Sequence, residues 1–223
     1  ASRRLYRGAN EQPLLQQRLL TPEPCWHSEL RAPLVPFVPD HRVFGRAVFP
    51  AAGSIAIGLG AAKALGRASE LRDVRFESMF PVEGGARCSV GVDAASGRFT
   101  VHGSGLGDAD DGAWSRHSSG RIAERPRGPD RTRVDLDAVR ARCPAQVAPE
   151  ALYARAAARG LDYGPAFRVV RALWRGEGEV LAEVRLAPEH VDPAYPLHPV
   201  LLDGAFQAVL ALVDDERAAL PVA

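Results

Sequence analysis

Two stretches of the sequence place a titratable side chain beside a strongly apolar helix. In the first, His41 is followed by Gly45, Pro50 and Gly53, and then by a run rich in Ala, Gly, Ile and Leu that ends at Leu65. This pattern predicts a histidine on a short strand or loop, a turn, and a buried helix with Pro50 near its first turn. A helix N-terminus offers free backbone N–H groups, which suit a carbonyl oxygen that gains negative charge. A histidine on an ordinary connecting loop is the alternative interpretation.

The second stretch runs from Leu197 to Leu210 and predicts another apolar helix. Asp203 is expected in its first turn, with Gln207 one turn later, so both side chains lie on one face. A carboxylate among leucines and a phenylalanine is costly to bury as an anion, so burial should raise the pKa of Asp203. Asp203 is therefore a candidate acid with Gln207 as its orienting partner. The alternative is a helix-start residue that complements the helix dipole.

A third candidate element is Tyr163, Gly164 and Pro165. The phenol can donate a hydrogen bond to a substrate hydroxyl, and Gly-Pro fixes a turn that presents the ring without crowding a pocket. A turn with a partly buried tyrosine of no special role is the alternative interpretation.

Together these motifs resemble, in the same order, the three signatures of the dehydratase domain of modular type I polyketide synthases. The matching motifs are His41-x-x-x-Gly45-x-x-x-x-Pro50, Tyr163-Gly164-Pro165-Ala166-Phe167 and His198-Pro199-Val200-Leu201-Leu202-Asp203-x-x-x-Gln207. Segments 12–15 and 114–120 extend the resemblance over nearly the whole chain. The resemblance implies an α+β double hotdog fold, in which two long central helices are each wrapped by an antiparallel sheet and the active site lies between them.

The function implied is dehydration of a β-hydroxyacyl thioester, carried on the phosphopantetheine arm of an acyl carrier protein, to the α,β-unsaturated thioester. Such an enzyme is a hydro-lyase of polyketide chain elongation. We expect neutral His41 to take the α-proton and Asp203 to protonate the leaving hydroxyl, aided by Gln207 and Tyr163. The amides near Ala52 and Gly53 would polarise the thioester carbonyl. No cofactor or metal is expected, and the expected partners are the carrier protein, neighbouring synthase domains and a second copy in a homodimer.

Other functions stay open at this point. A related domain also closes a cyclic ether by oxa-Michael addition with the same His and Asp. Relatives that move a double bond usually lack the Asp, so Asp203 argues against that activity. A non-catalytic structural module of the synthase is disfavoured because His41, Asp203, Gln207 and Tyr163 are all present. In the family the segment around His117 is a sheet strand, which favours a structural, hydrogen-bonded role for this histidine.

One position departs from the pattern of the family. Many relatives carry an aromatic residue and then a glutamate after the glycine of the first helix, whereas this chain has Ser54, Ile55 and Ala56. We therefore expect an altered pocket lining beside an intact histidine and turn.

The composition excludes several classes of protein. The 223 residues include 28 basic and 27 acidic residues, a net charge of +1, so no excess charge attracts nucleic acid or an anionic membrane. Cys25, Cys88 and Cys143 form no disulfide or zinc pattern, which favours a reducing cytoplasm. The most apolar run, 48–65, is broken by Pro50, by glycines and by Lys63, so it predicts a buried helix rather than a membrane span.

The sequence predicts two hotdogs, 1–124 and 134–223, joined by a Pro-, Gly- and charge-rich linker at 125–133. It ends where the next strands of a relative would begin, so we expect an incomplete second hotdog: either a fragment or missing strands supplied from elsewhere. Helices are expected at 136–143, at 149–159 and from 199, and a solvated loop at 102–112. Strands are expected at 25–38, 71–80, 86–92, 98–101, 113–123, 166–174 and 179–186.

Overall fold

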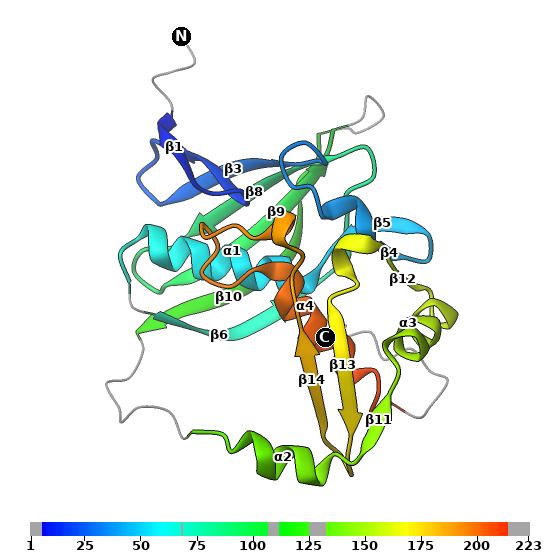
Figure 1. The fold of residues 1–223 in the computed structure, drawn as a ribbon. Helices are drawn as coiled ribbons and strands as arrows, with labels where there is room; N and C mark the ends of the chain where they lie inside the picture. Colours follow the sequence, from blue (N-terminus) through cyan, green and yellow to red (C-terminus); the bar gives the residue numbers. More distant parts are fainter. Residues whose placement is uncertain (1–5, 68, 107–111, 125–132, 214–223) are drawn as a thin grey trace.

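A seven-stranded antiparallel sheet wraps one buried helix in the N-terminal half of the chain (Figure 1). The computed structural model describes residues 6–67, 69–106, 112–124 and 133–213. The helix is α1 (Ala51–Ala64). The strands, in sheet order, are β1 (Tyr6–Gln12), β2 (Leu15–Leu19), β3 (Cys25–Leu30), β8 (Ala86–Val92), β9 (Arg98–Gly105), β10 (Ser115–Glu124) and β6 (Ser69–Phe76).

Helix α1 is enclosed because it has no polar face. Its small residues let the strands approach closely, and Ala52, Ile57 and Ala61 are fully buried. At Gly60 an added Cβ would lie 1.8 Å from Nε2 of Gln12, whose amide donates to the Ala56 carbonyl at 3.3 Å. The predicted buried helix is therefore confirmed, with Pro50 as its N-cap residue.

A second, four-stranded sheet joins the two halves of the chain. Its order is β12 (Leu161–Tyr163), β4 (His41–Val43), β5 (Arg46–Phe49) and β7 (Phe80–Pro81). In the β12–β4 pair, Tyr163 lies opposite His41. The β4–β5 turn carries Phe44 at φ 49° and Gly45 at φ 77°, the two left-handed residues of a tight hairpin. Gly45 allows this turn between β4 and β5, and it is not among the residues that line the cavity described below.

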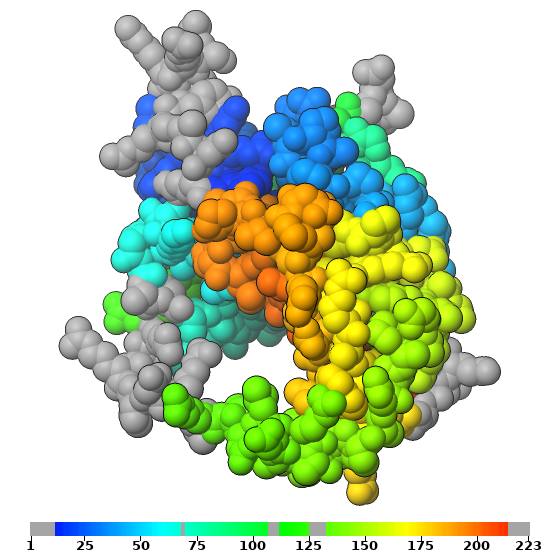
Figure 2. Space-filling view, viewed as in Figure 1, coloured from blue at the N-terminus to red at the C-terminus, as the bar shows by residue number. Residues whose placement is uncertain are grey.

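The C-terminal half carries a three-stranded sheet and two apolar-faced helices. Helix α4 (Pro199–Val209) packs on β13 (Val170–Arg175), on β14 (Val180–Val184) and on α1. In Figure 2 the orange segment that leads into α4 packs directly between the two halves. The remaining elements are η2 (Val38–Asp40), α2 (Leu136–Arg142), β11 (Ala145–Val147), α3 (Pro149–Ala158), η3 (Pro165–Phe167) and η4 (Pro188–His190).

The predicted helices agree with the structure, and four strand predictions need correction. The strand expected at 25–38 ends at Leu30 as β3, and turns and the short helix η2 take the place of its expected extended end. The single strand expected at 71–80 is split into β6 and β7 around residues 77–79. Strand β9 continues to Gly105, where a loop was expected from His102, because it pairs with β8 as far as Ala86. The strand expected at 166–174 begins as the short helix η3, since Pro165 cannot donate to a ladder.

The residue boundaries of the two hotdogs, 1–124 and 134–223, stay a prediction. The predicted linker between them, apart from Arg133, lies outside the described residues. Strands from both predicted domains nevertheless share the β12–β4 ladder. Within the part of the chain that the structure describes, no helix has the length and apolar character that a membrane crossing requires.

Asp40 fastens this junction between the two halves. Its carbonyl accepts a hydrogen bond from the Gly164 amide at 2.7 Å, and its carboxylate accepts one from the Ala166 amide at 2.8 Å. Gly164, the N-cap residue of η3, has no side chain to cap that helix, so Asp40 supplies the cap from the other half. An added Cβ at residue 164 would lie 2.5 Å from Cγ of Asp40, which explains the glycine.

We predict that Asp40→Ala lowers the free energy of unfolding by about 1 kcal/mol, the usual cost of a lost cap. Asp40→Asn retains a carbonyl oxygen and should recover most of this loss. Urea denaturation followed by circular dichroism measures both, with Asp162→Ala, an exposed aspartate on β12, as the control. An Asp40→Ala variant that unfolds at the wild-type urea concentration would contradict the assigned cap.

Candidate active site

The His41 ring is held in one tautomer. Its Nδ1 lies 2.8 Å from the Val48 carbonyl, and because a carbonyl can only accept, Nδ1 carries the proton. Nε2 of the neutral ring is then unprotonated, and it lies 3.9 Å from Oδ1 of Asp203. The buried ring is packed by Phe167, at 5.2 Å between ring centroids, and by Tyr163, at 5.8 Å. His41 thus presents a ring nitrogen to a buried carboxyl group.

Asp203 lies in the second turn of α4, not in the first turn as the sequence suggested. The helix begins at Pro199, and His198 is its N-cap, with Nδ1 accepting from the Val200 amide at 3.3 Å. Burial lowers the pKa of His198 to about 4, so this cap is a neutral acceptor. The helix-dipole interpretation of Asp203 therefore fails, because the dipole effect is confined to the first turn.

The Asp203 carboxyl is 5% exposed. Burial raises its pKa, and this outweighs the lowering by nearby His41 and by the hydrogen bond from Gln207. A raised pKa keeps a proton available on the carboxyl at a pH where an ordinary aspartate has lost it. The structure therefore agrees with the raised Asp203 pKa that the sequence predicted.

Gln207 is fully buried and orients Asp203 as the spacing predicted. Its Nε2 donates to Oδ2 of Asp203 at 2.8 Å and to the Phe167 carbonyl at 3.0 Å. Its Oε1 accepts from the Tyr153 hydroxyl at 3.3 Å. Tyr153 was not predicted from the sequence, because its partner Gln207 lies on another helix and the pattern of α3 marks Tyr153 only as a buried residue.

Tyr163 ends β12 and turns its ring toward His41. Burial raises the pKa of its phenol, and the charge of Asp203 adds to this, so the hydroxyl stays a donor. Gly164 and Pro165 form the turn that follows it, which Asp40 holds, and neither residue lines the cavity described next.

These groups line a mostly apolar cavity of about 450 Å³. Ala51 and Ser54 of α1 line one wall, so the departure at Ser54 does fall in the pocket. The other lining residues are His41, Val43, Val48, Phe49, Phe76, Ser78, Met79, Phe80, His117, Leu161, Tyr163, Asp203, Phe206, Val209, Leu210 and Val213.

The role expected for the Gly53 amide needs correction. This amide donates to the Pro50 carbonyl at 2.8 Å, so it is already engaged. An added Cβ at residue 53 would lie 2.4 Å from Cζ of Phe49, so this glycine makes room for an aromatic ring of the cavity wall. The amide of Ala52 is then the donor of the first turn that a carbonyl oxygen could use.

His117 also lines this cavity. Its ring stacks on Phe80 at 4.2 Å between centroids, and its Nδ1 lies 2.9 Å from Oγ of Ser78. Burial lowers its pKa. The hydrogen bond beside the sheet is the one expected from sequence, whereas its position at the cavity was not foreseen.

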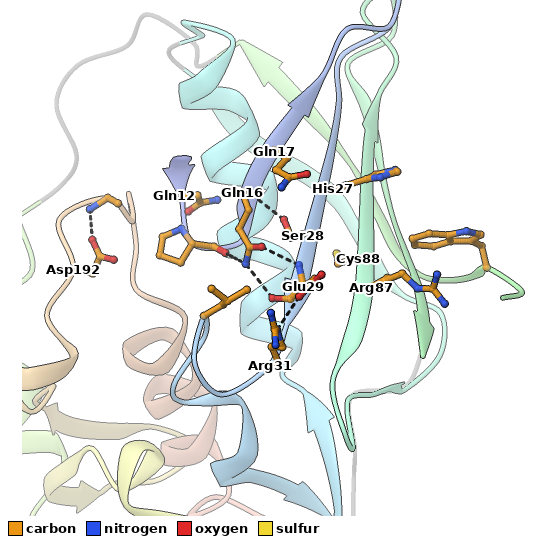
Figure 3. A pocket seen from close by; sticks show the side chains of 14 residues that line it. Gln12, Gln16, Gln17, His27, Ser28, Glu29, Arg31, Arg87, Cys88 and Asp192 are labelled. Carbon is orange, nitrogen blue, oxygen red and sulfur yellow. Dashed lines mark hydrogen bonds and ion pairs between the residues drawn. The ribbon is translucent and has the colours of Figure 1, made fainter. Parts of the chain in front are cut away.

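A second hollow, of about 680 Å³, lies over β2 and β3 (Figure 3). Gln16 crosses it, donating to the Pro13 and Glu29 carbonyls at 2.9 and 3.0 Å and accepting from the Glu29 amide at 3.0 Å. Glu29 also pairs with Arg31 at 2.7 Å. Gln16 and the backbone of Glu29 therefore satisfy one another within this hollow.

The side chains that could support metal or sulfur chemistry are the His, Cys, Asp and Glu side chains of the described residues. Over the described ranges, no cluster of three or more His, Cys, Asp or Glu side chains is placed to hold a metal ion. Cys25, Cys88 and Cys143 are free thiols, and Cys88 is fully buried.

Comparison with known proteins identifies the family. Residues 12–104 match a family described as "Polyketide synthase dehydratase domain", and residues 131–223 match "Polyketide synthase dehydratase N-terminal domain". The chain is 35% identical over 187 residues to the polyketide synthase GfsB of Streptomyces halstedii, and 32% identical over 184 residues to the erythronolide synthase EryA2 of Saccharopolyspora erythraea. Each alignment covers 78% of this chain but only 3% and 5% of those long proteins.

Solved structures agree with this assignment. The dehydratase domain from the CurK module of the curacin polyketide synthase superposes with a TM-score of 0.82 and 26% identity, covering 94% of this chain and 80% of that one. The corresponding CurF domain gives a TM-score of 0.81, also at 26% identity. The expected double hotdog fold is thereby confirmed, and the chain belongs to the dehydratase domains of modular type I polyketide synthases.

Proposed function

We propose that this chain eliminates water from a β-hydroxyacyl thioester, giving the α,β-unsaturated thioester during polyketide elongation. The observation that carries the proposal is the placement of Nε2 of His41 3.9 Å from Oδ1 of the buried Asp203 carboxyl, with Nδ1 of the same ring held by the Val48 carbonyl. A base and an acid that face each other across an apolar cavity are what this elimination requires.

The reaction can be written with these two groups. His41 Nε2 takes the proton from the α-carbon, and the electrons of that C–H bond form the double bond to the β-carbon. The β-carbon–oxygen bond breaks, and Asp203 gives its proton to the departing oxygen, which leaves as water. The enzyme then holds an imidazolium and a carboxylate, and return of the proton from His41 to Asp203 restores the starting state. Exclusion of water from the cavity strengthens both interactions.

Tyr163 and Ala52 complete the site in this proposal. The Tyr163 phenol donates to the β-hydroxyl, and the Ala52 amide donates to the thioester carbonyl, where negative charge develops. Proton transfers alone balance the reaction, so it needs no cofactor. The CurJ dehydratase, a structural relative at 26% identity, is described as inactive when one of its histidines is replaced by phenylalanine, which supports a histidine in the central role.

The partners follow from the family. Because the relatives are polyketide synthases, we place this domain beside other synthase domains, where an acyl carrier protein presents the substrate on its phosphopantetheine arm. A cytoplasmic homodimer belongs to the same proposal.

We predict that His41→Ala and Asp203→Asn each lower the rate of dehydration by at least about 100-fold, the usual size of an acid–base contribution. The assay follows 3-hydroxybutyryl pantetheine thioester by mass spectrometry, with circular dichroism as the check on folding. His27→Ala and Asp162→Asn, which lie outside the cavity, serve as controls. Wild-type turnover in a folded His41→Ala variant would disprove the assigned base, and an inactive wild type would refute the proposed reaction.

Asp203 should also leave a signature in stability. Burial raises the pKa of Asp203 in the folded chain above its value of about 3.9 in the unfolded chain. At a pH between the unfolded and the folded pKa, the folded chain therefore binds a proton that the unfolded chain has lost. The free energy of unfolding should therefore fall as pH rises from about 4 through the folded pKa. Asp203→Asn removes this titration, so the wild type should lose stability relative to the variant with rising pH. Urea titrations of both proteins between pH 5 and 8 measure the difference, and the opposite slope would contradict a raised pKa.

A further inference from the structure

We infer that Tyr153 is a positioning residue that, through Gln207, leaves Oδ1 as the oxygen of Asp203 that carries the reacting proton. This inference rests on the proposed function, and it deepens that function by naming a residue on a third element, α3, that serves the acid. Tyr153 touches neither the cavity nor His41, so it acts only through its neighbours.

The Tyr153 hydroxyl has one proton, and the structure determines where that proton goes. The Val170 amide donates to the hydroxyl oxygen at 3.1 Å, so this contact uses a lone pair and leaves the O–H free to donate. The acceptors in reach are Oε1 of Gln207, at 3.3 Å, and the Phe167 carbonyl, at 3.5 Å. The shorter contact makes Gln207 the main acceptor.

This contact fixes which end of the Gln207 amide faces Asp203. With Oε1 on Tyr153, the two N–H groups of Nε2 donate to the Phe167 carbonyl and to Oδ2 of Asp203, and the buried amide is satisfied. A flipped amide would set its oxygen against the Phe167 carbonyl and leave the Tyr153 proton facing an N–H group. Tyr153 and Phe167 thus hold the donor on Oδ2 together.

A donor on Oδ2 decides the position of the proton in the neutral carboxyl. A carboxylic acid has one carbonyl-type oxygen, which is the better acceptor, and one O–H. Because Oδ2 accepts at 2.8 Å, the O–H belongs on Oδ1, the oxygen that lies 3.9 Å from Nε2 of His41. The proton is therefore on the side where the leaving hydroxyl meets the acid.

The charged and titratable groups around Asp203 are few among the described residues. His41 of β4 faces its carboxyl, Tyr163 of β12 and Tyr153 of α3 lie near enough to feel its charge, and Arg168 lies over the Tyr153 ring at 5.3 Å. The hydrogen bond from Gln207 lowers the pKa of Asp203, against the larger effect of burial. Weakening this bond should therefore raise that pKa further and make the carboxyl a weaker acid.

The test is Tyr153→Phe, which removes the hydroxyl and keeps the ring. We expect kcat for 3-hydroxybutyryl pantetheine thioester to fall about tenfold with KM within about twofold, and the alkaline limb of the kcat profile to move to higher pH. Tyr195→Phe is the matched control, because Tyr195 is equally buried, at 8% exposure, and packs on His198 instead. A loss of kcat without movement of the alkaline limb would reduce Tyr153 to a structural role.

A double-mutant cycle tests the route through Gln207. In a Gln207→Met background the hydrogen bonds from Tyr153 to Gln207 and from Gln207 to Asp203 are already lost. Adding Tyr153→Phe should then change neither kcat nor the alkaline limb of the kcat profile. An equal effect in both backgrounds would overturn the inference.

Carbon NMR titration of the Asp203 carboxyl separates this inference from the proposed reaction, because it needs no turnover. The pKa of Asp203 should rise in Tyr153→Phe and stay unchanged in Tyr195→Phe. If the wild type proves inactive, the proposed reaction fails, and the NMR titration still decides whether Tyr153 acts on the carboxyl. An unshifted Asp203 in Tyr153→Phe would overturn the inference.

Discussion

The short ladder between β4 and β12 is the contact on which the site depends. The ladder sets Tyr163 opposite His41. At its far end, the Gly160 carbonyl accepts a hydrogen bond from the Phe44 amide at 2.7 Å. Asp40 closes the near end through the turn at 164–166. A shift of one residue in this register would turn the His41 ring to the other face of the sheet, away from Asp203. The geometry of the acid and base is thus set by backbone hydrogen bonds between the two halves.

Burial explains how the polar groups of the site are organised. Burial beside an apolar cavity raises the pKa of Asp203, but burial also penalises every polar atom without a partner. The structure meets this cost by giving Nδ1 of His41 the Val48 carbonyl, and by giving Gln207 the partners Tyr153, Phe167 and Asp203. Nε2 of His41 and Oδ1 of Asp203 are left for the reaction.

The two apolar helices supply part of the wall of the cavity. Helix α1 brings Ala51 and Ser54, and helix α4 brings Asp203, Phe206 and Val209. Because α1 and α4 pack on each other, each helix covers part of the apolar surface of the other and both line one cavity. The packing of these two helices therefore stabilises the fold and shapes the cavity that Asp203 faces.

The sequence by itself determined the local features: two apolar helices, the strand that carries His41, the i, i+4 pair of Asp203 and Gln207, and the tight turn at Gly45. These depend on helical periodicity, capping and backbone conformation, which neighbouring residues set. Only the tertiary structure decided the His41 tautomer, the engagement of the Gly53 amide, the place of Asp203 in the second turn and the role of Tyr153. The His41 tautomer and the contact of Tyr153 with Gln207 come from contacts between distant segments, and a residue pattern does not fix the distance or direction of an individual hydrogen bond. The engagement of the Gly53 amide and the turn in which Asp203 lies depend on the residue at which α1 and α4 begin.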